Sequence, residues 1–304
     1  MPRPTVSIAI FAYNEEASIT ACLDAIAACA AEAEVTAHVL INGCTDGTEA
    51  VVRAYRPQGF AVVPVVIRLG DKANAWNVYT HEAAPAEADI HVFTDGDMEM
   101  RPGSLAGFAE RFAAEPEAWG CAALPVSGRS RDAFRAQLQG ERWMAGNLYA
   151  LRREAIAAFR ATGVRLPRGI FGEDGLVTTL VKYGLDTLGP RVDARVTATE
   201  QGGFAFRALS PWSLGDLRIY RNRKRRYALR QLQAEMLYPL LYEKGVGAMP
   251  EHVIDLYRAR FPATRLGWRG LDTIFAWEAR QRVIRDLAKA DEAVKAEDRA
   301  HLYS

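Results

Sequence analysis

The sequence predicts an α/β fold, in which a mostly parallel, Rossmann-like sheet is flanked by helices and followed by a helical C-terminal part. Short apolar runs alternate with helical patterns over the first two thirds of the chain, and polar residues cluster directly after several of the runs. From about residue 211 onward the strand patterns disappear. The chain has 304 residues, of which 49% are hydrophobic and 25% charged, a globular composition that excludes collagen, coiled coil and general disorder.

Five apolar runs are expected to form strands. The second run ends in a turn-forming segment at 42–47, and the third contains Pro64. Because proline cannot donate a hydrogen bond to a sheet ladder, Pro64 predicts an edge strand. The fourth run is short and apolar, as a buried parallel strand is, and the fifth run is a further candidate strand. The runs cover residues 6–12, 35–41, 60–67, 89–94 and 120–126.

Helices are predicted between the strands and throughout the last third. Apolar side chains from Ile19 to Cys29 recur at helical spacing, and residues 214–241 and 267–295 have long helical patterns. Breaks are expected at 245–250 and at Phe261-Pro262. We therefore predict a sheet domain over 1–205 and a helical region over 206–304, packed on the first domain or on a membrane surface.

Two classes of protein are not expected. No apolar run approaches the roughly 18 residues of a membrane span, and the first run continues into Asn14-Glu15-Glu16 without the small-residue cleavage site of a secretion signal. The four cysteines show neither C-x-x-C nor zinc-finger spacing, so a reduced, cytoplasmic location is expected, with Cys22 and Cys29 packing as small apolar side chains. Five tryptophans are expected in the core: Trp119, Trp143, Trp212, Trp268 and Trp277. For Trp143, contact with the acceptor is the alternative.

The net charge of +1 conceals two halves of opposite sign. Residues 1–120 contain 7 Lys/Arg and 17 Asp/Glu, whereas residues 121–304 contain 31 and 20. An acidic half favours a cation site, and a basic half favours contacts with anions. Mutual attraction of the two halves is the alternative.

Three predicted strands end in residues rich in hydrogen-bonding groups. The first is followed by Tyr13-Asn14-Glu15, the second by Asn42 and its turn, and the fourth by Asp95-Gly96-Asp97. Ligands of open α/β sheets bind at the carboxyl ends of the strands, so these residues are expected to line one crevice. Two carboxylates separated by a glycine suit Mg²⁺ or Mn²⁺, which bind through one or two carboxylates and substrate phosphates. A solvent-exposed Asp-Gly turn is the alternative.

Other nucleotide and hydrolase motifs are absent from the sequence. There is no G-x-G-x-x-G after the first strand and no G-x-x-x-x-G-K-[ST], which disfavours dinucleotide dehydrogenases and P-loop NTPases. There is also no H-E-x-x-H and no G-x-S-x-G, which disfavours zinc proteases and serine hydrolases.

Five motifs in order make the sequence resemble family 2 glycosyltransferases of the GT-A fold, over roughly residues 5–190. They are the segments at 11–16 (FAYNEE), 41–48 (INGCTDGT), 70–77 (GDKANAWN), 95–97 (DGD, a D-x-D motif) and 172–175 (GEDG). The resemblance implies an inverting, metal-dependent transfer of a sugar from a nucleotide-diphosphate donor to an acceptor hydroxyl.

Carried over to this chain, the resemblance implies several donor contacts. Tyr13 would lie against the nucleotide base, and Glu15 would contact the nucleoside. Asn42 stands where the family usually has aspartate, which is a departure because an amide both donates and accepts whereas a carboxylate only accepts. The resemblance still favours UDP, and GDP and other nucleotides stay open. Lys72 would approach the donor. Asp95 would bind ribose or the metal.

The resemblance also implies the metal ligand and the catalytic base. Asp97 would hold the metal that bridges the two phosphates. Asp174 matches the catalytic aspartate, which takes the proton of the acceptor hydroxyl. Glu173 would contact the acceptor or add negative charge at a helix N-terminus. The start of a helix before residues 176–181 is the structural alternative for this pair.

The basic segment at 218–230 contains seven Lys/Arg residues. Family members often place an arginine-rich element over the diphosphate, and Arg223 and Arg226 are the candidates because a guanidinium binds phosphate bidentately. Peripheral contact with an anionic membrane and a solvated charged face remain as alternatives. Nucleic acid is not expected as a partner.

The sequence thus predicts a non-processive glycosyltransferase of glycan or glycolipid biosynthesis. Its partners would be a nucleotide sugar, with UDP favoured, and a hydroxyl acceptor, with a lipid-linked acceptor as one option. It would act in the cytoplasm or at the inner face of the membrane. A catalytically inactive nucleotide-sugar-binding module and a nucleotidyltransferase are the alternatives, although the latter lacks its usual Gly-rich loop.

Overall fold

The computed structural model describes residues 3–128, 131–205 and 214–302 of the chain. The chain divides into two compact units. The first comprises residues 1–166 and 172–208, and the second comprises 167–171 and 209–304. The predicted boundary near residue 205 borders residues 206–213, which lie outside the described part.

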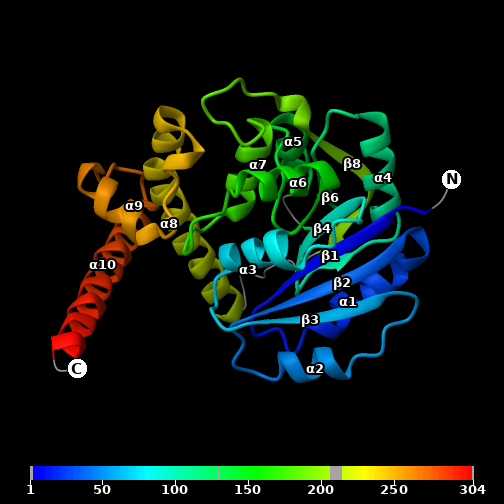
Figure 1. The fold of residues 1–304 in the computed structure, drawn as a ribbon, viewed down its shortest axis with the longest axis horizontal. Helices are drawn as coiled ribbons and strands as arrows, with labels where there is room; N and C mark the ends of the chain where they lie inside the picture. The colour runs from blue at the N-terminus through cyan, green and yellow to red at the C-terminus, as the bar shows by residue number, and fades with distance from the viewer. Residues whose placement is uncertain (1–2, 129–130, 206–213, 303–304) are drawn as a thin grey trace. The chain divides into compact units, whose positions relative to one another are not determined.

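The first unit is built on an eight-stranded sheet with the strand order β3-β2-β1-β4-β7-β6-β8-β5 (Figure 1). β1 pairs in parallel with β2 and β4, β2 with β3, and β6 with β8, while β7 and β5 run antiparallel to their neighbours. This arrangement confirms the predicted α/β class with a mostly parallel sheet. The strands are β1 (Thr5–Ala12), β2 (Glu34–Asn42), β3 (Ala61–Ile67), β4 (Ile90–Asp95), β5 (Glu99–Met100), β6 (Gly120–Pro125), β7 (Leu148–Arg152) and β8 (Val196–Ala205).

The five predicted strands all form, and β3 lies at an edge as Pro64 predicts. Three further strands were not predicted. β5 has only two residues. β7 continues directly into the helix that begins at Arg153, so the sequence of its five residues is equally compatible with the first turns of that helix. β8 ends through Gly202-Gly203, both at positive φ, where its pairing with β6 shifts register.

Side chains alternate between the two faces of the sheet, and each face has its own core. From β1, Ile8 and Ile10 join the aliphatic core formed with α1 and α4. The opposite face carries aromatic side chains, where Phe93 of β4 stacks on Tyr149 of β7 with ring centroids 4.8 Å apart. The helices of this unit are α1 (Ile19–Cys29), α2 (Thr48–Ala54), α3 (Lys72–Val78), α4 (Ser104–Ala114), α5 (Arg131–Gly140), α6 (Arg153–Thr162) and α7 (Glu173–Lys182).

Cys22 and Cys29 lie in the aliphatic core, as the helical spacing predicts. Burial raises the pKa of both thiols above the usual range, so they remain protonated apolar groups.

The second unit is helical, with α8 (Leu214–Lys244), α9 (Val253–Arg260) and α10 (Thr273–Leu302). Gln233 is fully buried at its centre, where its amide accepts from Phe171 N at 2.8 Å and donates to Tyr257 Oη at 2.7 Å. α10 begins six residues later than expected, because residues 265–272 form an exposed loop. No helix in the described residues is both long and apolar enough to cross a membrane.

Candidate functional site

The loops after β1 and β2 interlock at one end of the sheet. Asn14 Oδ1 accepts a hydrogen bond from Thr45 N at 2.8 Å, and Glu15 N donates to Thr48 Oγ1 at the same distance. Asn14 adopts a positive φ of 56°, a conformation that asparagine tolerates better than most residues. The two predicted polar loops therefore lie side by side.

The Asp95-Gly96-Asp97 turn after β4 is pressed against the same loops. Gly96 N donates to Phe11 O at 2.9 Å, and a Cβ on Gly96 would lie 3.2 Å from Phe11 O and 3.3 Å from Glu15 Cγ. A side chain at this position would push the turn away from β1. The glycine between the two aspartates is thus explained by close backbone approach, and all three predicted strand ends meet in one place.

A fourth loop, leading from β3 into α3, completes this end of the sheet. Asp71 N donates to Asn42 Oδ1 at 3.0 Å, so the oxygen of the buried Asn42 amide is used within the protein. A Cβ on Gly70 would lie 3.4 Å from Cε2 of Tyr13, whose side chain is 58% exposed. Tyr13 therefore presents a largely exposed ring beside this loop.

Lys72 is the first residue of α3, and Asp71 caps the helix by accepting a hydrogen bond from Asn74 N at 3.0 Å. Lys72 Nζ lies 2.5 Å from Asp95 Oδ1 and 2.8 Å from Glu173 Oε1. Lys72 therefore connects the end of β4 with the start of α7. The predicted site residues Lys72, Asp95 and Glu173 are in direct contact.

The carboxylates around Lys72 influence one another's protonation. Burial lowers the pKa of Lys72, but the charges of Asp95 and Glu173 outweigh this and hold the pKa well above its usual value. Burial raises the pKa of Asp95 to about 6, against the opposing charge of Lys72. The pKa of Glu15 is raised by burial and then by the charges of Asp97 and Asp95. This end of the sheet thus holds more negative than positive charge.

Asp174 is held by two backbone N–H groups at the start of α7. Its Oδ2 accepts from Gly146 N at 3.0 Å, and its Oδ1 accepts from Gly175 N at 2.8 Å. The preceding Gly172 has a φ of +80°, which favours glycine. Glu173 is buried and paired with Lys72, so its side chain does more than add charge at a helix end. The predicted helix start is correct, whereas the roles of Asp174 as the base and of Glu173 as an acceptor contact stay predictions.

Several residues of the site were not predicted. Gly146 donates to Asp174, and a Cβ on it would lie 3.4 Å from both Lys72 Nζ and Glu173 Oε1. Trp76 Nε1 donates to Tyr149 Oη at 3.0 Å, which joins α3 to β7 beneath the site. Gly146 stands two residues before β7, a strand too short to recognise from the sequence, so no local pattern marked this glycine.

A divalent metal fits this set of residues in one specific way. Among the described residues no group of three or more His, Cys, Asp or Glu side chains is arranged to hold a metal ion. Asp97 is exposed, and Asp95 is part-buried with its Oδ1 on Lys72, so these two carboxylates are the residues that could hold a metal. Mg²⁺ and Mn²⁺ commonly bind in this manner, completed by water and substrate phosphates.

Residues 7–165 match the model of the family described as glycosyl transferase family 2, which is more than half of the chain. The chain belongs to this family. It is therefore a glycosyltransferase of the GT-A fold, as the order of its motifs predicts. A comparison with curated proteins found no match.

Solved structures show the same fold for this family 2 chain. A mannosyltransferase, PcManGT, from Pyrobaculum calidifontis in complex with GDP-Man and Mn²⁺ is 20% identical, with a TM-score of 0.56 over 99% of this chain and 81% of that one. Residues 1–349 of TarS from S. aureus in complex with UDP-GlcNAc are 13% identical, with a TM-score of 0.53 over 93% and 92% of the two chains. At these identities the likeness concerns the fold.

Arg223 and Arg226 belong to α8 of the second unit of this family 2 chain. Neighbouring cations of the segment pair within that unit, Arg225 with Glu278 at 2.7 Å and Lys224 with Asp272 at 3.1 Å. Contact of Arg223 and Arg226 with a diphosphate stays a prediction.

The expected core position is wrong for two tryptophans. Trp268 is 86% exposed and Trp277 is 52% exposed. Trp143 is half-buried against the cluster of Leu124 and Leu138, and Trp212 lies outside the described residues.

Proposed function

We propose that the chain is an inverting, metal-dependent glycosyltransferase that moves a sugar from a nucleoside-diphosphate donor, with UDP favoured, to an acceptor hydroxyl in a non-processive reaction. The observation that carries the proposal is the contact of Lys72 with Asp95 and Glu173, beside the carboxylate of Asp174. Three separate segments contribute to this cluster, and such convergence is costly unless the side chains act together.

The donor would lie across the loops that follow β1, β2 and β4. The exposed ring of Tyr13 offers a stacking surface for a base, and Glu15 lies close enough to Asp97 and Asp95 to sense their charge. Because the oxygen of Asn42 accepts from Asp71 N, the NH₂ group is the half of the amide left to meet an acceptor on the base.

Asp97 and Asp95 are the residues that would hold Mg²⁺ or Mn²⁺. When bound, the cation supplies Lewis acidity toward the diphosphate leaving group. The Lys72 ammonium holds Asp95 in place in the free protein. The second ion pair of Lys72, with Glu173, keeps Lys72 next to the proposed base. With a donor bound, Lys72 is positioned to contribute a positive charge to the phosphates.

Asp174 is the proposed base. Its carboxylate takes the proton of the acceptor hydroxyl while that oxygen forms a bond to the anomeric carbon, and the bond from this carbon to the diphosphate oxygen breaks with both electrons leaving on the diphosphate. Two backbone N–H groups fix the direction of the carboxylate before the substrate arrives. A single displacement of this kind inverts the anomeric centre.

Asp174→Asn separates catalysis from donor binding. We expect the variant to lower turnover of a UDP-sugar by at least about 100-fold, because an amide cannot take the proton. Its affinity for UDP with Mn²⁺ should stay within about threefold of wild type. The measurements are release of UDP in the presence of candidate hydroxyl acceptors and titration calorimetry with UDP.

Asp186→Asn is the matched control, since Asp186 follows the far end of α7 and also accepts a backbone N–H, from Leu188 at 3.1 Å. It should keep wild-type turnover. Equal activity of the two variants would reject Asp174 as the base. UDP binding without any turnover in the wild type would favour an inactive nucleotide-sugar-binding module.

A further inference from the structure

The second unit exposes large apolar side chains on the loop at 265–272 and on the first turns of α10. Trp268 and Leu271 are each 86% exposed, and Ile274 and Trp277 are 60% and 52% exposed. Ile284, 48% exposed, continues the same stripe, because positions 274, 277 and 284 recur at helical spacing. Contiguous exposed apolar residues of this size are uncommon on a soluble surface unless something covers them.

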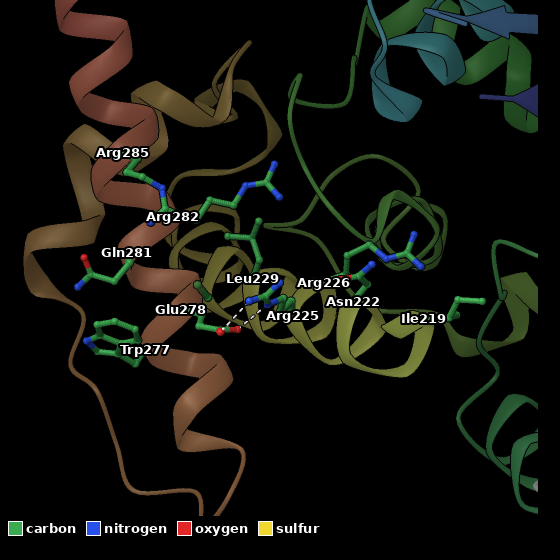
Figure 2. Close-up of a pocket in the computed structure, with 11 residues that line it drawn as sticks. Ile219, Asn222, Arg225, Arg226, Leu229, Trp277, Glu278, Gln281, Arg282 and Arg285 are labelled. Atoms are coloured by element: carbon green, nitrogen blue, oxygen red, sulfur yellow. Dashed lines mark hydrogen bonds and ion pairs between the residues drawn. The ribbon is translucent and has the colours of Figure 1, made fainter. Parts of the chain in front are cut away.

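Cations lie beside part of this apolar surface. A groove of about 840 Å³ between α8 and α10 is lined by Arg225, Arg226, Arg282 and Arg285, with Trp277 at its side (Figure 2). Arg225 is paired with Glu278, whereas Arg226 and Arg285 form no ion pair with any described residue. The groove therefore has an excess of positive charge.

Two ion pairs hold the exposed loop beside the basic helix. Lys224 Nζ lies 3.1 Å from Asp272 Oδ1, and Arg269 Nη2 lies 2.6 Å from Glu235 Oε1. The loop that carries Trp268 is thus anchored to α8 close to the basic segment at 218–230. That segment has seven Lys/Arg residues and no acidic one. Apolar and cationic side chains occur together on one unit.

We propose that this surface, formed by the loop at 265–272, the exposed stripe of α10 and the cations of α8, binds the surface of an anionic lipid bilayer. Arginine side chains would meet lipid phosphates, and Trp268 and Leu271 would enter the boundary between headgroups and acyl chains. Aromatic and aliphatic side chains beside cations are the composition that such an interface selects. The proposal does not depend on the transferase reaction.

Charge and residue type favour an anionic bilayer over a second copy of the chain and over nucleic acid. A symmetric contact with a second copy would place the same positive surface against itself, which like-charge repulsion disfavours. Nucleic acid would satisfy the arginines, but Leu271, Ile274 and Ile284 would gain nothing from a phosphate backbone. An anionic bilayer satisfies both kinds of side chain.

Vesicle co-sedimentation of the full chain tests the proposal. We expect binding to vesicles of phosphatidylcholine with about 30% phosphatidylglycerol, little binding to phosphatidylcholine alone, and weaker binding in 0.5 M salt. Arg226→Gln/Arg285→Gln, which removes the two groove cations that form no ion pair with a described residue, should weaken binding roughly 25-fold, at about fivefold for each charge lost. Trp268→Ser/Leu271→Ser should weaken it about tenfold or more, and as both residues are exposed the fold should be unaffected.

Matched variants on the first unit serve as controls. Leu188→Ser removes a side chain that is 62% exposed, and Arg56→Gln/Arg68→Gln removes two exposed cations. Both should bind vesicles as the wild type does. No sedimentation with anionic vesicles, or equal losses in the test and control variants, would overturn the proposal. So would a stable dimer in light scattering that Trp268→Ser/Leu271→Ser dissociates without any change in vesicle binding.

Discussion

Gly43, directly after β2, makes a close backbone contact on which the loops of the proposed donor site depend. It has a φ of +67°, and a Cβ there would lie 2.5 Å from Gly70 Cα and 2.6 Å from Gly70 N. Both of those atoms belong to the backbone, so no side chain can turn aside to make room. In Gly43→Ala, the loops after β2 and β3 would have to separate.

The cost of Gly43→Ala has two parts. An alanine at this φ loses about 1 kcal/mol relative to glycine. Forcing atoms into a packed contact adds about 1–3 kcal/mol. We therefore expect a total loss of about 2–4 kcal/mol in the free energy of unfolding. UDP binding should also weaken, because Gly70 lies in the loop beside Tyr13 and the backbone N–H of the neighbouring Asp71 donates to Asn42.

Gly163→Ala isolates the first part of that cost. Gly163 ends α6 in the same unit at the identical φ of +67°, but nothing lies within 4 Å of its would-be Cβ. Urea denaturation followed by circular dichroism should show a loss of about 1 kcal/mol for this variant. Losses that agree within about 0.5 kcal/mol for the two glycines would refute the close contact.

Two further predictions concern buried charge in the first unit. Burial, followed by the charges of Arg160 and Arg153, lowers the pKa of His91 to about 4, so below pH 6.5 the unfolded chain takes up a proton that the folded chain does not. The free energy of unfolding should therefore fall by about 3 kcal/mol between pH 7 and pH 4. His91→Leu should show a smaller fall in urea melts recorded over the same pH range. Lys72→Met leaves Asp95 and Glu173 without their shared cation, so the metal-free variant should lose about 1–3 kcal/mol in the free energy of unfolding. Mn²⁺ should stabilise this variant more than it stabilises the wild type. Equal effects of Mn²⁺ on the two proteins would contradict the proposed metal ligands.

The part of the site that lies at strand ends could be predicted from the sequence. Apolar runs identify β1, β2 and β4, and parallel strands bring their carboxyl ends to one edge, so Tyr13, Asn42 and Asp95 could be grouped without a structure. The contact of Lys72 with Glu173 could not be predicted from spacing, because it joins residues 101 positions apart on two helices.

The missed features have local physical causes. β7 is five residues long and antiparallel, so neither length nor alternation distinguishes it from the helix that follows, and the role of Gly146 before it was hidden as well. Trp268 was expected in the core because large aromatic residues are usually buried. Ion pairs of Arg269 and Asp272, which follow it in the chain, hold its loop beside α8 instead, and no periodic pattern indicates such pairs.

The most direct test of the central claim is the thermal stability of the chain with UDP, GDP, CDP and dTDP, each with and without Mn²⁺. A ligand at 100 times its dissociation constant adds about 2.7 kcal/mol, which raises the melting temperature of a chain this size by at least a few degrees. Asp97→Asn is the test variant, and Glu99→Gln, an exposed neighbour at 53%, is the control. We predict that one diphosphate, UDP before the others, raises the melting temperature only with Mn²⁺, in the wild type and in Glu99→Gln but not in Asp97→Asn. No shift with any of the four, or an equal shift in Asp97→Asn, would contradict a metal-dependent donor site at the ends of β1, β2 and β4.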